Sequence, residues 1–312
     1  MKKNKPGIKV IGIGGSGSNA ITRMMDYDIS GVDLVVMNTD AQDIKSAKAD
    51  LKMQIGKEAT QGLGTGMDYK LGEKSAIESK EEIEEVLKDS DMIFIACGLG
   101  GGTGTGASPV VAEIAKKSGA LTIAVVTKPF TFEGNTRKRI AQKGLKRLRE
   151  KVDTLLVIPN DKLLKMKDRD ILLEDAFWAC DEVLREAVQG ISDLIVKPGI
   201  INLDFADIKS IMKNSGPAIF GIGRATGSKR ATTATLRAIN SPLLNFSIKG
   251  AKGVLFNVAG SKDLTLFEVN TVAKIITKSV NPRAKIIFGA ARDKGLKEGE
   301  IKVVVIANGF KS

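Results

Sequence analysis

The sequence contains no histidine. This absence excludes a histidine general base, a Ser-His-Asp triad and any metal site with a histidine ligand. Any catalysis by this chain must therefore use carboxylates, a bound cation or backbone dipoles. Cysteine is almost absent as well. The two that occur, Cys97 and Cys180, lie in apolar surroundings, which predicts reduced core residues rather than a disulfide framework.

Long apolar runs are also missing. No stretch approaches the roughly 18 uninterrupted apolar residues of a membrane span, and the start of the chain is too brief for a signal peptide. A cytosolic location is therefore the expectation. With 43% apolar residues among 312, the chain can bury a large core, and we expect it to form two domains.

Acidic residues are scarce in the last third of the chain. Residues 208–312 contain 18 Lys or Arg against 5 Asp or Glu, a net charge of +13, so the whole excess of +12 lies there. Two interpretations fit this asymmetry: a solvated basic face, or direct contact with an acidic partner or a lipid surface. Aromatic residues make up only 4% of the chain, too few for a stacking platform, so no nucleic-acid partner is expected.

Glycine, in contrast, is concentrated in one run. Residues 98–107 read Gly-Leu-Gly-Gly-Gly-Thr-Gly-Thr-Gly-Ala and follow an apolar segment, 92–97, that is expected to be a buried strand. Successive glycines let backbone N–H groups approach an anion with no Cβ in the way. A helix predicted to start at Ala107, with Pro109 in its first turn, would direct its N-terminal dipole at the same anion. The run therefore predicts a nucleotide phosphate site.

The commoner phosphate motifs do not explain this run. No Gly-x-x-x-x-Gly-Lys-Ser/Thr string occurs in the chain. A Gly-x-Gly-x-x-Gly string does occur, at residues 12–17, after a predicted strand. Asp40 lies about 20 residues beyond it, where a dinucleotide-dependent oxidoreductase would have its ribose ligand. That rival hypothesis leaves the second glycine run unexplained and lacks a histidine or paired lysines for hydride chemistry.

Strand and helix patterns alternate in the first half of the chain, as in a parallel sheet with crossover helices. The predicted strands, apolar on both faces, are 8–13, 34–37, 92–96, 121–127 and 155–158. Loops that follow such strands line the ligand crevice. Here these loops include both glycine runs and residues 38–42, 128–137 and 159–161.

A long buried helix is predicted from about residue 170 to 195, because apolar residues recur there at three- and four-residue spacing. They are Leu173, Phe177, Cys180, Leu184, Ala187, Ile191 and Ile195. Strands at 218–222, 253–258, 285–288 and 303–306, with helices at 232–238 and 266–278, suggest a smaller α+β domain. The predicted fold class is α/β, with a Rossmann-like nucleotide-binding domain over 1–169, a central helix over 170–196 and the α+β domain over 197–312.

The chain resembles the tubulin/FtsZ family, and its bacterial-type FtsZ cell-division GTPases in particular. The family signature, Gly-Gly-Gly-Thr-Gly-Thr-Gly, matches residues 100–106. Companion motifs follow in family order over nearly the whole chain, at residues 14–20, 38–42, 62–66, 132–134, 160–161 and 201–207. Each motif alone has low specificity, but the ordered set is highly specific. The resemblance implies the tubulin/FtsZ fold, GTP or GDP as ligand, and Mg²⁺.

The resemblance also implies which residues bind the nucleotide. In this family both glycine-rich loops hold the phosphates, which explains why one chain needs two. The residues assigned to the phosphates and the loops around them are Gly14, Gly15, Ser16, Gly17, Asn19, Asn38, Asp40, Gly64, Gly101, Gly102, Thr103, Gly104, Thr105 and Gly106. Glu133 is assigned to the ribose hydroxyls, with Arg137 and Asn160 also at the nucleotide. A solvated loop glutamate is the alternative for Glu133.

Guanine selectivity comes only through the resemblance. Phe177 matches the residue that stacks on the base, and Asp181, one turn later, matches the one that hydrogen-bonds the guanine edge. A carboxylate accepts from both N1–H and the exocyclic amine of guanine, and it repels the acceptor N1 of adenine. Ordinary core packing is the alternative for Phe177. Asp181 is harder to explain as core, because an unpaired carboxylate costs several kcal/mol there.

The resemblance implies that hydrolysis requires residues from a second chain. Asn202, Asp204 and Asp207 match the synergy loop, which enters the nucleotide site of the next subunit. Such a head-to-tail contact does not close and generates a filament. The two aspartates would position or polarise the attacking water, with Mg²⁺ helping to neutralise the phosphates, and Asn202 would touch the nucleotide. The structural alternative is a helix start, with Asp204 as N-cap and Asp207 favoured by the dipole.

The implied function is a GTPase that polymerises with itself and forms the cytokinetic ring at the division site. The alternative within the family is a copolymerising or regulatory paralogue that binds GTP with little hydrolysis. No side chains are assigned to a metal. The chain ends near the point where the folded domains of the family end, without the flexible tail that usually binds membrane-tethering proteins. Either this sequence is a truncated form of a longer chain, or tethering uses another route.

Overall fold

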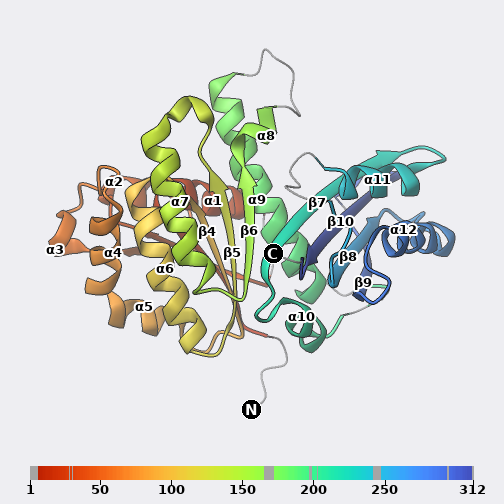
Figure 1. Ribbon diagram of the computed structural model, residues 1–312, viewed down its shortest axis with the longest axis horizontal. Helices are drawn as coiled ribbons and strands as arrows, with labels where there is room; N and C mark the ends of the chain where they lie inside the picture. The colour runs from red at the N-terminus through yellow and green to blue at the C-terminus, as the bar shows by residue number, and fades with distance from the viewer. Residues whose placement is uncertain are drawn as a thin grey trace. The chain divides into compact units, whose positions relative to one another are not determined.

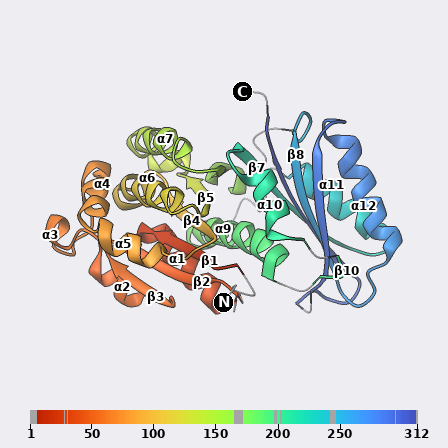
Figure 2. The same cartoon turned by 90° about the horizontal axis from the view of Figure 1, so that it is seen from below.

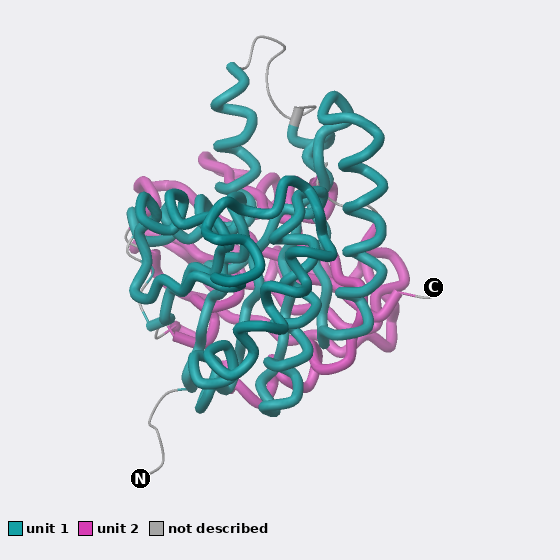
Figure 3. The backbone as a smooth tube through the Cα atoms, turned by 90° about the vertical axis from the view of Figure 1, so that its left-hand side faces the viewer, with its two compact units in different colours: residues 1–189 teal, residues 190–312 magenta. Residues whose placement is uncertain are grey.

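The computed structural model describes residues 6–27, 29, 31–164, 172–196, 199–201, 203–241, 247–293 and 295–310. The chain divides into two compact units, Met1–Gln189 and Gly190–Ser312, which Figure 3 distinguishes by colour. Each unit has its own set of strands and its own buried core. In the described part of the chain, no helix is long and apolar enough to cross a lipid bilayer.

The sheet of the first unit is parallel throughout, as predicted. Its strands are β1 (Ile8–Ile13), β2 (Asp33–Asn38), β3 (Leu51–Gln54), β4 (Met92–Gly98), β5 (Leu121–Lys128) and β6 (Thr154–Pro159). Their order is β3-β2-β1-β4-β5-β6. The edge strand β3 was not predicted, because it is four residues long and two of them, Leu51 and Lys52, are exposed.

Helices cover both faces of this sheet. They are α1 (Gly14–Asp26), α2 (Ala41–Ser46), α3 (Lys57–Thr60), α4 (Tyr69–Glu78), α5 (Lys80–Leu87), α6 (Gly102–Lys117), the 3₁₀ turn η1 (Thr131–Glu133), α7 (Asn135–Arg149) and α8 (Asn160–Leu164). Residues of α4, α5, α6 and α7 share one apolar cluster with one face of the strands, and Figure 2 shows these helices grouped together.

The strand order reverses between β1 and β4, which are neighbours at the centre of this order. Figure 1 shows β5 and β6 following β4 on one side. The chain leaves β1 through α1 and turns toward β2, whereas it leaves β4 through α6 and turns toward β5. In open α/β sheets a ligand crevice lies at such a switch point, beyond the carboxyl ends of the strands. Both glycine runs occupy this position.

The start of α6 differs from the prediction. The helix begins at Gly102 rather than at Ala107, so Pro109 lies in its interior and the glycines form its first turns. Tight packing explains the difference. A Cβ on Gly106 would collide with the carbonyl oxygen of Tyr69 in α4, and one on Gly104 would lie 2.7 Å from the carbonyl oxygen of Gly98. Most glycines of the signature run thus permit close helix packing.

The second unit is the predicted α+β domain. Its strands are β7 (Gly216–Thr226), β8 (Gly253–Gly260), β9 (Lys285–Arg292) and β10 (Glu300–Asn308), in the order β7-β10-β8-β9. Strand β10 is antiparallel to β7 and β8, while β8 and β9 are parallel. Residues of α11 (Arg230–Ile239) and α12 (Leu266–Ser279) join the apolar cluster of this sheet, and α10 (Phe205–Met212) contacts β8 and β9.

The long helix is α9 (Leu173–Val196), and it crosses the boundary between the units. The prediction that it is buried throughout is wrong at its start. Leu184, Ala187 and Ile191 are fully buried, but 63% of Leu173 and 41% of Phe177 are exposed. Regular apolar spacing therefore does not distinguish core residues from apolar side chains that face a ligand or a partner.

Both cysteines are free and buried, as predicted. Burial raises the pKa of the Cys97 thiol to about 12 and raises the pKa of the Cys180 thiol far above its usual range. Neither thiol is therefore a nucleophile at neutral pH.

Candidate functional site

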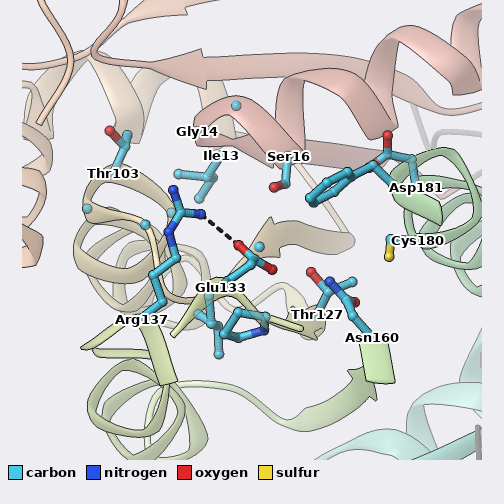
Figure 4. Close-up of a pocket in the computed structure, with 18 of the residues that line it drawn as sticks. Ile13, Gly14, Ser16, Thr103, Thr127, Glu133, Arg137, Asn160, Cys180 and Asp181 are labelled. Atoms are coloured by element: carbon cyan, nitrogen blue, oxygen red, sulfur yellow. Dashed lines mark hydrogen bonds and ion pairs between the residues drawn. The ribbon is translucent and has the colours of Figure 1, made fainter. Parts of the chain in front are cut away.

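A pocket of about 260 Å³ lies at the switch point of the first unit (Figure 4). Its lining comes from the starts of α1 and α6, the carboxyl ends of β4 and β5, η1, α7, α8 and α9. Twelve of the predicted binding residues line it: Gly14, Gly15, Ser16, Gly101, Gly102, Thr103, Gly104, Glu133, Arg137, Asn160, Phe177 and Asp181.

Seven lining residues were not predicted: Ile13, Thr65, Gly98, Leu99, Thr127, Pro129 and Cys180. For most of them the sequence contains a feature that indicates a position at the ligand crevice. Ile13, Gly98 and Thr127 lie at the carboxyl ends of β1, β4 and β5, where the ligand crevice of a parallel sheet is expected. Thr65 belongs to the glycine-rich stretch 62–66. No feature of the sequence indicates that Cys180 lines the pocket, because it lies on the apolar stripe of the long helix and looks like a core residue.

Two helix N-termini face this pocket. Neither Ile13, the N-cap of α1, nor Gly101, the N-cap of α6, provides a side-chain cap. The first N–H groups of both helices therefore have no capping side chain, and the dipoles of both helices favour an anion in the pocket. A Cβ on Gly14 would lie 2.9 Å from the amide nitrogen of Gly104, so the two helix starts nearly touch. The arrangement suits a phosphate group.

Gly101 differs from its neighbours in the signature run. Its backbone is ordinary, with φ −83° and ψ 175°, and a Cβ there would have no heavy atom within 4 Å. Gly15 on the first run is similar, with a single atom, Asp43 Oδ2, at 3.8 Å. Nothing in the described protein requires glycine at these two positions. A ligand that occupies the adjacent space does require it.

Three threonine hydroxyls connect the loops around the pocket. Thr103 Oγ1 lies 2.7 Å from Thr39 Oγ1 and 3.2 Å from Thr65 Oγ1. All three residues are buried. The contact fixes the start of α6 against the loop after β2 and the stretch before α4, so it determines the geometry of the phosphate end of the pocket.

Glu133 and Arg137 form the next part of the wall. Arg137 Nη1 donates to Glu133 Oε2 at 2.8 Å, which is the dashed contact in Figure 4. The backbone N–H of Phe130 donates to Glu133 Oε1, also at 2.8 Å. Both oxygens are thereby oriented while each keeps a lone pair. Glu133 is therefore a fixed acceptor in the pocket wall rather than a freely solvated side chain.

Polar and aromatic groups from α8 and α9 close the other end of the pocket. The Phe177 ring meets Phe130 edge to face, with centroids 5.4 Å apart, and remains 41% exposed. Asn160 is buried, and its Oδ1 has no hydrogen-bond partner among the described residues. Burial raises the pKa of Asp181 to about 6, although Arg23 opposes the shift. An exposed ring beside unpaired acceptors suits a flat heterocycle with N–H donors.

Seven predicted residues do not line the pocket: Gly17, Asn19, Asn38, Asp40, Gly64, Thr105 and Gly106. Several of them shape the loops instead. Asp40 caps α2 by accepting from the backbone N–H of Gln42 and Asp43. Asn38 Oδ1 accepts from the N–H of Thr39, and Thr105 Oγ1 accepts from the N–H of Gly100. Gly17 packs against β1 and β4, where a Cβ would lie 2.7 Å from the carbonyl oxygen of Ala96.

The three predicted catalytic residues belong to the second unit. Asn202 lies outside the described residues. Asp204 occupies the N-cap position of α10, but its carboxylate makes no capping hydrogen bond. Asp204 and Asp207 are exposed, and within the described chain neither carboxylate has a hydrogen-bond or ion-pair partner. The structure thus places Asp204 at the N-cap and Asp207 in the first turn of α10, as the structural alternative predicted, but without a capping hydrogen bond from the Asp204 side chain. Both carboxylates are exposed and lie one turn apart.

Comparison with known families identifies the fold. A model of the Tubulin/FtsZ family GTPase domain matches residues 7–168, which contain both glycine runs. A model of the FtsZ family C-terminal domain matches residues 216–311. The chain belongs to the FtsZ branch of the tubulin/FtsZ family. As an FtsZ-family chain it contains a GTPase domain. The matched residues 7–168 include the pocket lining up to Asn160, and the remaining lining residues, Phe177, Cys180 and Asp181, follow in α9.

Solved structures agree with this assignment. An empty FtsZ dimer from M. jannaschii is 50% identical to this chain, with a TM-score of 0.95, and the match covers 99% of this chain and 89% of the other. A tryptophan-to-tyrosine variant of that FtsZ gives the same identity and TM-score, over 98% and 92%. The GTPγS-bound CetZ2 protofilament from Haloferax volcanii is 22% identical, with a TM-score of 0.83 over 98% and 93%, and shares the fold.

Proposed function

We propose that this chain is a cell-division GTPase that polymerises head to tail into filaments and forms the cytokinetic ring at the division site. The observation that supports this most is the convergence of two uncapped helix N-termini on one pocket of an FtsZ-family GTPase domain. The partners are further copies of the same chain, since a relative at 50% identity was solved as a dimer. Membrane-tethering proteins at the division site are the second class of partner.

In this proposal the starts of α1 and α6 bind the phosphates of GTP. Gly15 and Gly101 offer backbone N–H groups that no Cβ shields. Ser16 adds its own backbone N–H, and Thr103 fixes the surrounding loops. Gly17, Thr105 and Gly106 do not line the pocket, but their packing supports the starts of α1 and α6. The phosphates contribute most of the binding energy through charge-assisted hydrogen bonds.

The remaining pocket residues bind the nucleoside. Glu133 accepts hydrogen bonds from the ribose hydroxyls, and Arg137 holds the carboxylate in place. Phe177 stacks on the base, and the Asp181 carboxylate accepts from N1–H and the exocyclic amine of guanine. Asn160 Oδ1, which lacks a partner within the described chain, supplies a further acceptor. Adenine would present its own acceptor to Asp181, so we expect GTP to be preferred over ATP.

Mg²⁺ fits the pocket only as a partner of the phosphates. No group of three or more Asp, Glu, His or Cys side chains that could hold a metal ion occurs in the described part of the chain. This agrees with the usual habit of Mg²⁺, which takes phosphate oxygens and water and few protein ligands. When bound, the ion would neutralise phosphate charge during hydrolysis.

Hydrolysis in this proposal requires a second chain. Every residue that lines the pocket precedes residue 182, while Asp204 and Asp207 belong to the second unit. Both carboxylates are exposed and unpaired in the described chain, as expected for groups that act on a neighbouring molecule. Inserted beside the terminal phosphate of the adjacent subunit, they orient and polarise the attacking water. Asn202 contacts the same nucleotide.

The first experiment measures phosphate release from GTP, with ATP in parallel, over a series of protein concentrations. A rate near zero below a threshold, and linear above it with GTP alone, is expected if assembly completes the active site. A rate proportional to concentration from the origin would mean that each chain hydrolyses alone. GTP binding and filaments without phosphate release would instead support the paralogue with little hydrolysis.

A mixing experiment tests the shared site directly. Asp207→Ala should bind GTP but not hydrolyse it, and Gly101→Asp should fail to bind because its carboxylate meets the phosphates. Neither variant alone is expected to release phosphate. In a mixture, Asp207 of the second variant can meet the GTP of the first, so activity should return. No recovery in co-assembled filaments would contradict catalysis between chains.

A further inference from the structure

An arginine outside the pocket lining contacts the residue proposed to read guanine. Arg23 lies in α1, and its Nε donates to Asp181 Oδ2 at 3.2 Å. The Asp181 side chain is only 10% exposed, while that of Arg23 is 27% exposed. The contact uses Oδ2, and Oδ1 of Asp181 has no hydrogen-bond partner among the described residues. One carboxylate edge is thus held and the other is available to a ligand.

Trp178 restrains this arginine from the solvent side. The centre of the Arg23 guanidinium lies 5.2 Å from the centroid of the Trp178 ring, and the ring itself is 40% exposed. A guanidinium over an indole face is attracted electrostatically and loses little freedom when it forms a hydrogen bond. Arg23 is therefore restrained by two contacts, one with the Trp178 ring and one with the Asp181 carboxylate.

Helix α1 connects this contact to the phosphate end of the pocket. The helix begins at Gly14, beside the signature run, and Arg23 follows nine residues later in the same unbroken helix. At 1.5 Å per residue the two points are about 13 Å apart along the axis. One rigid element thus presents an anion site at its start and a cation near its end, at a separation comparable to the length of a nucleoside triphosphate.

We propose that Arg23 is a specificity-determining positioning residue, which holds the Asp181 carboxylate in the orientation and the negative charge state needed to accept two hydrogen bonds from guanine. This inference rests on the proposed role of Asp181 in the GTP site. Without Arg23, burial alone would act on Asp181 and favour its neutral form. A protonated carboxyl group can donate to adenine N1, so the preference for GTP would weaken as well.

The surroundings of Asp181 decide the direction of the pH effect. Arg23 on α1 is its charged partner, and Glu133 at the pocket wall is paired with Arg137. The adjacent Cys180 thiol stays neutral, because burial raises its pKa far above its usual range. Burial raises the pKa of Asp181 to about 6 against the opposing effect of Arg23, so its carboxyl group titrates near neutrality. GTP affinity should fall below that pH in the wild type, and at a higher pH once Arg23 is removed.

The test compares Arg23→Gln with the charge-retaining control Arg23→Lys. Affinities for GTP and ATP are measured by competition with a fluorescent GTP analogue, from pH 5.5 to 8.5. For Arg23→Gln we expect the GTP-to-ATP preference at pH 7 to drop about tenfold and the midpoint of the GTP profile to rise by about one pH unit. Arg23→Lys should keep the midpoint of the wild type.

The outcomes separate this inference from the proposed function. A wild type that does not prefer GTP over ATP would overturn the proposed function of the pocket. A wild-type preference and midpoint that persist in Arg23→Gln would overturn only the role of Arg23. If Arg23→Gln does not fold, Trp178→Leu carries the same test, because it releases the guanidinium without removing it. It should shift the midpoint upward by a smaller amount, and an unchanged profile would contradict the proposal.

Discussion

The hydroxyl oxygens of Thr39 and Thr103 lie 2.7 Å apart, although 64 residues separate them in the chain. Thr65 Oγ1 lies 3.2 Å from the same Thr103 oxygen. Three loops that the sequence presents as separate stretches are thus joined at one buried point. The geometry of the phosphate end of the pocket depends on this contact.

Replacing Thr103 by valine should destabilise the fold and weaken GTP binding together. The change keeps the shape of the side chain but leaves two buried hydroxyls without their partner, at a cost of about 1–3 kcal/mol. Urea unfolding and GTP affinity measure the two effects. Thr103→Ser retains the hydroxyl and should lie close to the wild type in both. A valine variant as stable as the wild type would show that the contact does not hold the loops.

Two glycines of the signature run should respond differently to alanine. Gly101→Ala adds a Cβ with no protein atom within 4 Å, so the free energy of unfolding should change by less than about 0.5 kcal/mol, while GTP affinity should fall at least tenfold. Gly106→Ala meets the Tyr69 carbonyl in α4 and should cost about 1–3 kcal/mol or more. Thermal unfolding and nucleotide binding of both variants check this pair. Normal GTP binding by Gly101→Ala would exclude a ligand beside that position.

Asp204→Ala should abolish GTP turnover without a measurable loss of stability. Its carboxylate makes no capping hydrogen bond, so the usual cap penalty of about 0.5–2 kcal/mol should not arise. Thr265→Ala is the matched control, because Thr265 Oγ1 accepts from the N–H of Glu268 at the start of α12. That variant should lose the cap energy and keep turnover. A destabilised Asp204→Ala would instead support a structural role for the carboxylate.

Asp181 should make the nucleotide-free protein less stable as the pH rises from about 4 to about 6. Its pKa in the folded chain, about 6, lies above the ordinary value of 3.8, so the folded state holds the proton more tightly than the unfolded state. Ionisation then costs about 2–3 kcal/mol above pH 6. Urea unfolding at pH 4.5 and 7.5 should reveal this decrease in the wild type and a smaller one in Asp181→Asn. Equal decreases in both proteins would assign the effect to other groups.

The position of the pocket could be predicted from the sequence, because it depends on which segments follow one another along the chain. A strand that ends in a glycine run places backbone N–H groups at the carboxyl edge of the sheet, and this held for both β1 and β4. The contact among Thr39, Thr65 and Thr103 could not be predicted, since it joins distant segments through packing. Likewise, nothing in the sequence pairs Arg23 with Asp181.

The errors arose where tertiary packing outweighs local preference. Glycine has a poor helix propensity, so the sequence placed the start of α6 after the glycine run. In the structure, α4 approaches α6 so closely that glycine is required at Gly106 inside the helix. Apolar spacing predicted a buried Phe177, whose ring is instead partly exposed at the pocket. Asp204 does occupy the N-cap position of α10, as the structural alternative predicted, but its carboxylate makes no capping hydrogen bond, which the sequence could not show.

The close approach of α4 to α6 also affects how this sequence can diverge. A Cβ on Gly72 would meet the carbonyl oxygen of Gly102, just as one on Gly106 would meet that of Tyr69. A larger residue on either helix therefore forces the backbone of the other to move. We expect Gly72 and the glycine run to be inherited as a unit, so that a lineage losing one must acquire a compensating change in the facing helix.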